Sequence, residues 1–278
     1  MRGRITGEPA HLKWPSAMGR PTSREGLGTL NGSLRVKLGF PVIYVSILVA
    51  LGVLPQLGIG RDITEYAWNL LKGYSNESLT ITEFLYAYAL LAFPLLITLS
   101  FYEDEKQSKN EAMLIRAGSW RAWRRMSDKI CRRFIFGYWA CYAFISLVAL
   151  LALYLIVGYS AENAMELGSY FDMGGTAFMG VCFVMIPLRL VELLLMYELA
   201  LAVFGLTRNT IAAFLVTLIL PVICAYVLPD LSPFGFSSAY NILNAFAGGG
   251  SRMAAITISP VILFGALIIF NNIRRKYK

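Results

Sequence analysis

Three ionisable side chains inside one long apolar stretch are the groups in this sequence best placed to do chemistry. Arg189, Glu192 and Glu198 lie between Phe178 and Leu206, a run longer than the roughly 20 residues that cross a hydrocarbon core. A charged group near the middle of a membrane costs about 2.5–3.5 kcal/mol on insertion scales. Such groups therefore usually pair, line a polar cavity or relay ions.

The spacing of these three residues predicts their partners. Arg189 and Glu192 are three residues apart and share one helix face, so we expect them to form an ion pair that fixes the packing of neighbouring spans. The alternative is a polar cavity or a seam between subunits. Glu198 lies about 2.5 turns beyond Arg189 and points elsewhere, and we expect it to meet Arg208.

The other reactive residue types do not form a recognisable catalytic or metal site. His11 is the only histidine, and neither G-x-S-x-G nor H-E-x-x-H occurs. The four cysteines lie in or beside apolar runs without metal-ligand spacing, and we expect them to pack as small apolar residues: Cys131, Cys141, Cys182 and Cys224. We therefore predict a chain that is not an enzyme and binds no metal or cofactor itself.

Six apolar runs separated by polar segments must position these residues. With 57% apolar residues, 15% charged residues and a mean hydropathy of +0.59, the composition is that of a polytopic membrane protein. We predict an all-α fold with six transmembrane helices, at about Phe40–Gly58, Phe84–Tyr102, Phe134–Gly158, Phe178–Leu206, Thr210–Leu228 and Ala254–Ile273.

The distribution of Lys and Arg predicts the orientation of these helices. Of 25 such residues, 21 lie before the first span, between the second and third, at Arg208 or after the last span. Three lie on the other side, at Arg61, Lys72 and Arg252. The positive-inside rule therefore places both termini in the cytoplasm. The net charge of +8 is accordingly a topology signal, and we expect no nucleic acid as a partner.

Two domains follow from the same pattern. Residues 1–33 are rich in Arg, Gly and Pro without helical periodicity, which predicts a flexible cytoplasmic arm and no cleavable signal peptide. Residues 34–278 form the transmembrane domain. We expect Tyr159–Ala177 to be an external loop. In the loop between the first two spans we expect aromatic anchors at the membrane interface: Tyr66, Trp68 and Tyr74.

The segment 103–133, between the second and third spans, begins with an acidic cluster that includes Glu103 and Glu105. A short cytoplasmic helix is predicted next, over about 108–118. Its start is marked by the capping box of Ser108 and Glu111, and its end by Gly118.

Three apolar residues give this short helix a surface with which to dock: Met113, Leu114 and Ile115. The alternative is an ordinary amphipathic surface turn. From Ser119 a second helix is expected to run through basic residues into the third span.

The segment of about 230–251, between the last two spans, is too short and polar to cross the membrane. It begins with Ser232, Pro233 and Phe234, and a short helix is expected over Ser238 to Ala247. The Gly248–Gly250 run should end that helix. We predict an external, re-entrant cap.

The order of these features resembles the membrane subunit of an ABC type-2 transporter from about Ser33 onward. Three features carry the resemblance. They are the acidic cluster with its short helix after the second span, the tight Thr207-Arg208-Asn209-Thr210 turn, and Leu231-Ser232-Pro233-Phe234 after the fifth span.

The resemblance implies an ATP-driven exporter. No G-x-x-x-x-G-K-[ST] motif occurs in the chain, so ATP and Mg would be bound by a separate ABC ATPase subunit. The implied contact with that ATPase is the 108–118 helix, with its acidic neighbours. A second permease copy or a homologous permease would complete the pathway. Lipid would surround it, and the implied location is the bacterial plasma membrane.

Two other functions are compatible with the intramembrane charges. The first is an ion- or proton-coupled secondary transporter that uses Glu192 and Glu198 as relay groups, although an inverted repeat is not obvious. The second is an intramembrane enzyme, which the lack of a histidine-based site disfavours. The apolar and aromatic spans suit an amphipathic, peptide, drug-like or lipidic cargo.

Overall fold

The computed structural model describes residues 39–53, 62–74, 81–108, 120–170, 174–228, 232–247 and 249–277. All of them belong to one compact unit, Gly39–Lys278. The described residues lie mostly in helices, and none of them lies in a strand. The expected all-α fold is confirmed for this part of the chain. The predicted arm, 1–33, lies outside it.

Five helices are long and apolar enough to cross a membrane, so the chain has the character of a multi-pass membrane protein. They are α4 (Ile81–Ser108), α6 (Trp120–Val157), α8 (Gly175–Thr207), α9 (Thr210–Val227) and α11 (Gly250–Tyr277). The segment expected as the first span contains α2 (Gly39–Val53), an apolar helix of 15 residues. This length is below the roughly 20 residues that a span needs, so the sixth crossing stays a prediction.

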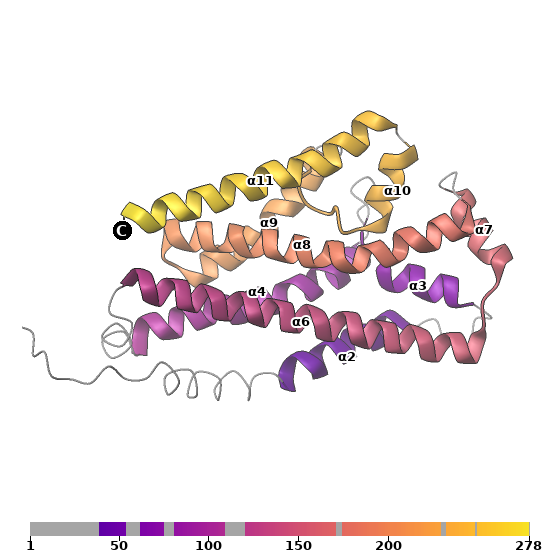
Figure 1. Cartoon of the computed structure of the whole chain (residues 1–278), viewed down its shortest axis with the longest axis horizontal. Coiled ribbons are helices and arrows are strands. Elements are labelled where there is room, and N and C mark those ends of the chain that lie inside the picture. The colour runs from indigo at the N-terminus through magenta and orange to yellow at the C-terminus, as the bar shows by residue number, and fades with distance from the viewer. Residues whose placement is uncertain are drawn as a thin grey trace, which may run out of the picture. The chain divides into compact units, whose positions relative to one another are not determined.

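Three further helices of nine residues each lie between the long ones: α3 (Ile63–Leu71), α7 (Ala161–Ser169) and α10 (Ala239–Ala247). They gather at one end of the helical bundle, and the C-terminal end of α11 lies at the opposite end (Figure 1). We call these the short-helix end and the opposite end. The predicted helix over 238–247 is confirmed as α10, whereas α3 and α7 were not expected.

The aromatic residues before the second span are not interface anchors, because Tyr66, Trp68 and Tyr74 are all buried. Trp68 packs between the rings of Phe178 and Tyr240, at centroid distances of 5.2 and 4.8 Å. The missed signal for α3 is Asp62 followed three residues later by Glu65, which is typical of a helix start. Asp62 caps α3 by accepting a hydrogen bond from the Glu65 backbone N–H at 3.4 Å.

The tight turn between α8 and α9 forms as predicted. Helix α8 ends at Thr207, and Arg208 adopts a left-handed conformation with φ of 54°. Asn209 then caps α9, its side chain accepting a hydrogen bond from the Ala212 backbone N–H at 3.1 Å. The helix expected from Ser119 is also present, since α6 begins at Trp120 and continues through the third span.

Two tyrosines from neighbouring helices donate hydrogen bonds to backbone carbonyls near a proline in the middle of α4. Pro94 has no N–H, so the carbonyl of Leu90 loses its partner in the helix. The Tyr138 hydroxyl on α6 donates to Leu90 O at 2.9 Å, and the Tyr44 hydroxyl on α2 donates to Ala89 O at 2.7 Å. Backbone groups in a hydrocarbon core must find partners within the protein. These two tyrosines therefore tie α2, α4 and α6 together at the proline.

Replacing Tyr138 with Phe should lower the free energy of unfolding by about 0.5–1.5 kcal/mol, because the Leu90 carbonyl loses its donor. The measurement is reversible unfolding in mixed detergent. The matched control makes the same change in a Pro94→Ala background, where the amide of residue 94 restores the helical bond to Leu90. The cost of Tyr138→Phe should be markedly smaller there, and an equal cost in both backgrounds would contradict the assignment.

Candidate functional site

Arg189 lies deep in the bundle and caps the end of the short helix α3. It is 6% exposed, and its Nη1 and Nη2 donate to the carbonyls of Leu70 and Leu71 at 3.3 and 3.0 Å. These are the last residues of α3, whose final carbonyls have no partner within their own helix. The C-terminal end of a helix carries partial negative charge, so a guanidinium is the favoured partner there.

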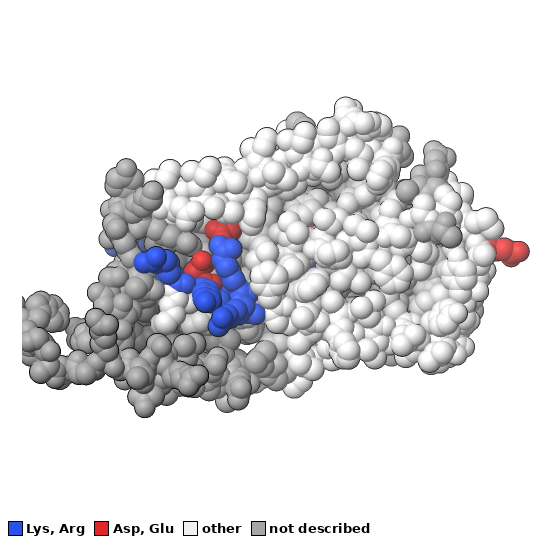
Figure 2. Space-filling view, in the orientation of Figure 1, with Lys and Arg blue, Asp and Glu red and all other residues white. Residues whose placement is uncertain are grey.

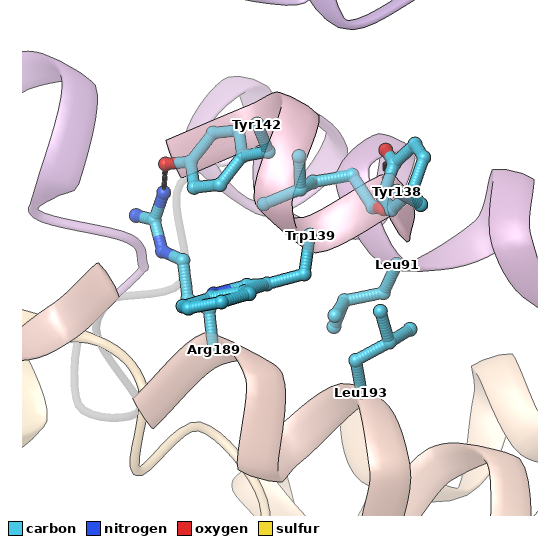
Figure 3. Close-up of a pocket in the computed structure, with 7 residues that line it drawn as sticks. Leu91, Tyr138, Trp139, Tyr142, Arg189 and Leu193 are labelled. Carbon is cyan, nitrogen blue, oxygen red and sulfur yellow. Dashed lines mark hydrogen bonds between the residues drawn. The ribbon is translucent and has the colours of Figure 1, made fainter. Parts of the chain in front are cut away.

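Helix α6 supplies a further hydrogen-bond partner of Arg189. Nη1 also hydrogen-bonds the Tyr142 hydroxyl, and the guanidinium lies 5.4 Å from the centre of the Tyr142 ring. Figure 3 shows the arginine reaching from α8 toward this tyrosine. The Trp139 indole N–H donates to Ile186 O on α8 at 2.9 Å. Arg189 thus connects α3, α6 and α8.

Glu192, one turn further along α8, binds a different segment. Its carboxylate accepts hydrogen bonds from the backbone N–H groups of Gly235 at 2.7 Å and Ser237 at 3.3 Å, and from the Ser237 hydroxyl. Glu192 is 2% exposed, so these three donors replace the water that a buried carboxylate would otherwise need. The segment that it holds leads directly into α10.

The expected ion pair between Arg189 and Glu192 is therefore wrong. The two side chains share a helix face as predicted, but each turns to a separate chain segment, and no N–O distance between them falls within 4.0 Å. We call Arg189 and Glu192 together the α8 clamp. It fixes the end of α3 with one charge and the start of α10 with the other.

The two clamped segments also bind each other. Ser238 Oγ lies 2.8 Å from Lys72 O and 2.6 Å from Tyr74 O, and Tyr240 N donates to Lys72 O at 3.4 Å. Gly73 makes this approach possible, since its φ is 72° and a Cβ there would lie 2.8 Å from Ser238 Cβ. Residues 72–74 and 238–240 thus form a direct joint between α3 and α10.

The beginning of α3 is held as firmly as its end. Asp62 Oδ2 accepts hydrogen bonds from Thr64 Oγ1 and from the Ser160 backbone N–H, both at 2.9 Å. Ile63 N donates to Gly158 O at 3.2 Å. The α6–α7 turn therefore fixes the N-terminus of α3, and the α8 clamp fixes its C-terminus.

The predicted cap residues belong to this arrangement. Ser232 and Phe234 are buried at 2% and 1% exposure, and Pro233 between them is half-buried. Ser232 Oγ accepts from Phe234 N at 3.3 Å and donates to Phe234 O at 3.2 Å, which makes a local turn. The described residues 232–247 thus pack into the bundle, and the external, re-entrant path expected for about 230–251 stays a prediction.

A small pocket adjoins the clamp between α4, α6 and α8. Its lining is apolar and aromatic apart from Arg189, and consists of Leu90, Leu91, Tyr138, Trp139, Tyr142, Arg189 and Leu193. In Figure 3, Leu91 and Leu193 close the side away from the guanidinium. This lining includes no nucleophile paired with a base, so the pocket offers no obvious means of covalent catalysis.

Glu198 takes part in a second polar cluster, at the opposite end of the bundle. It accepts hydrogen bonds from Arg132 on α6 and from Asn271 Nδ2 on α11, the latter at 2.8 Å. The expected contact with Arg208 is wrong, because Arg208 is exposed in the α8–α9 turn. Glu198 instead joins α6 and α11 to α8, and Figure 2 shows acidic and basic groups gathered on this part of the surface.

Asp128 extends this second cluster to α4. Its carboxylate accepts hydrogen bonds from Arg132 Nε at 3.2 Å and from the Tyr197 hydroxyl at 2.9 Å. The Tyr197 hydroxyl in turn lies 3.4 Å from that of Tyr102. Four long helices, α4, α6, α8 and α11, therefore meet in one hydrogen-bonded network.

The residues predicted to contact an ATPase are mostly beyond the described part of the chain. Glu103 is half-buried on α4, and this helix continues past the expected end of the span, through Glu105, to Ser108. Glu111, Met113, Leu114, Ile115 and Gly118 lie outside the described residues, as does most of the predicted 108–118 helix. The four cysteines are free thiols, and Cys131 and Cys182 are buried.

Several residues of both polar clusters were not singled out from the sequence. Tyr142, Ser237 and Asn271 are unremarkable within their own segments, and only the fold brings them to Arg189, Glu192 and Glu198. Asp128 had a detectable signal, since it is the one acidic residue within a strongly basic helix segment and lies four residues before Arg132.

Comparison with known proteins gives no family for this chain. No family model, no curated protein and no solved structure matches it.

Replacing Glu192 with Gln should loosen the start of α10. An amide NH2 would face the donors at Gly235 and Ser237, so we expect the free energy of unfolding to fall by about 1–3 kcal/mol. Thermal unfolding in detergent measures this. Glu166→Gln on the exposed face of α7 makes the same chemical change without burial and should be neutral. Equal behaviour of the two variants would contradict the clamp.

Proposed function

We propose that this chain is the transmembrane subunit of an ATP-driven ABC exporter with a separate ATPase subunit. The observation that carries the proposal is α10, a short helix that folds back into the bundle between the last two long helices after Ser232, Pro233 and Phe234. The tight Thr207–Thr210 turn and the extension of α6 into its basic segment agree with the same resemblance.

In this proposal the chain crosses the membrane six times, with both termini in the cytoplasm. The bias of Lys and Arg supports that orientation. The short-helix end then faces outward and the opposite end faces the ATPase. ATP and Mg bind to the partner, and the predicted 108–118 helix transmits its movement to the spans. A second permease copy or a homologous permease completes the pathway in a bacterial plasma membrane.

The proposed cargo is amphipathic: a peptide, a drug-like molecule or a lipid. The support is chemical, since the spans are rich in apolar and aromatic side chains and their polar groups are mostly occupied within the fold. A proton-coupled transporter that uses Glu192 and Glu198 is less well supported. Glu192 has three donors and Glu198 is held by Arg132 and Asn271, so neither carboxylate is available as a simple relay.

Purification of the full chain from its native membrane should bring down an ATP-binding protein of separate sequence. Mass spectrometry of the purified complex and its ATPase activity are the measurements. The purified chain alone should neither bind nor hydrolyse ATP. Transport by the chain in liposomes with no such partner would contradict the proposal.

Replacing Glu105 with Ala, or Met113 and Leu114 together with Ser, should uncouple ATP hydrolysis from transport in the reconstituted complex. The expected result is a several-fold lower transport per ATP hydrolysed, with the partner still bound, because the contact transmits movement rather than holding the complex together. Glu162→Ala, on exposed α7, is the control at the other end. Unchanged coupling in both test variants would count against the docking role.

A further inference from the structure

Helix α6 carries a continuous exposed face that begins with two cations and continues as apolar surface. Lys129 and Arg133 lie four residues apart and are both exposed. The same face continues through apolar side chains that are 46–77% exposed: Phe136, Phe144, Leu147, Val148, Leu151 and Leu155. We call this the α6 face.

The length of α6 places its two cations at the depth of lipid headgroups. The 24 residues from 134 to 157 span about 36 Å, enough to cross a hydrocarbon core of about 30 Å with some tilt. Arg133 then lies at the membrane boundary and Lys129 one turn beyond it. At that depth the ammonium and guanidinium groups reach the phosphate layer while their aliphatic stems stay on the apolar surface.

The α6 face has no occupant within the described part of the chain. No ion pair is found there for Lys129 or Arg133, whereas the neighbouring Asp128 and Arg132 are engaged with α8. Below Arg133 the surface is open, since a Cβ at Gly137 would meet nothing within 4 Å, and Ala140 is exposed. Two small residues thus lie between the exposed rings of Phe136 and Phe144.

We propose that the α6 face binds an anionic phospholipid, its phosphate at Lys129 and Arg133 and an acyl chain along Gly137 and Ala140 between Phe136 and Phe144. Charge complementarity selects the headgroup, because each cation near a membrane surface adds attraction to anionic lipid. The apolar surface directly below the cations selects a lipid over free phosphate or an acidic protein, which would leave that surface uncovered. This inference requires only that α6 crosses a membrane.

The test is lipid retention by the full chain, purified from nanodiscs that contain phosphatidylcholine and phosphatidylglycerol. Phosphatidylglycerol bound per chain is measured by mass spectrometry of extracted lipid at increasing competitor phosphatidylcholine. The double variant Lys129→Gln, Arg133→Gln should bind phosphatidylglycerol about 30-fold more weakly. Arg208→Gln, which removes an exposed cation from the α8–α9 turn at the same end, should retain it as the unaltered chain does.

Two controls separate loss of the charges from loss of folding. The charge-preserving variant Lys129→Arg, Arg133→Lys should retain phosphatidylglycerol, and all variants should unfold at the same temperature in phosphatidylcholine alone. The proposal would be overturned by equal retention in the Gln double variant, by displacement of the lipid by inorganic phosphate, or by equal loss with Arg208→Gln. Loss of a dimer or of a co-purified protein with lipid retention unchanged would also overturn it, and would assign the face to a protein contact.

Discussion

The guanidinium of Arg189 donates hydrogen bonds to the last carbonyls of α3 in the apolar interior of the bundle, where either group without a partner would be unfavourable. A helix that ends inside an apolar bundle leaves carbonyl groups without partners, and a lone arginine there carries an uncompensated charge. Arg189 meets both needs, because its Nη atoms bond Leu70 O and Leu71 O. The position of α3 within the bundle therefore depends on one side chain of α8.

Glu192 likewise binds backbone groups at the end of a chain segment, but as an acceptor with negative charge. Its carboxylate accepts from backbone N–H groups at Gly235 and Ser237, just before α10 begins. Helices of nine residues, such as α3 and α10, are marginal on their own in water. Their stability must come from packing and from bonds to neighbours, which the α8 clamp and the joint at Gly73 and Ser238 provide. Hydrogen bonds to backbone groups at short distance offset part of the cost of burying the two charges.

The sequence was informative where one segment determines its own structure. Apolar length predicted the five long helices, the short polar gap between two apolar runs predicted the turn at Arg208, and the glycine run after Ala247 predicted where α10 ends. It failed where the partner of a side chain comes from a distant segment. The spacing of Arg189 and Glu192 correctly put them on one face and wrongly paired them, because spacing within a helix contains no information about Leu70 or Gly235. Helix α3 was missed because its aromatic residues, typical of a membrane interface, are used as core.

The two polar clusters also determine which helices can move past each other. Helix α8 supplies Arg189, Glu192 and Glu198. Helix α6 meets it in both clusters, through Tyr142 in the middle of the bundle and through Arg132 at the opposite end. Separating α6 from α8 would break hydrogen bonds in both clusters at once. Helix α9 differs, since its side chains make no hydrogen bond to another helix among the described residues, and its contacts with α4 and α8 are mainly apolar. Apolar contacts can slide without leaving a polar group unpaired in a hydrocarbon core. A conformational change in this protein would therefore keep α6 and α8 together as one body and displace α9 against them.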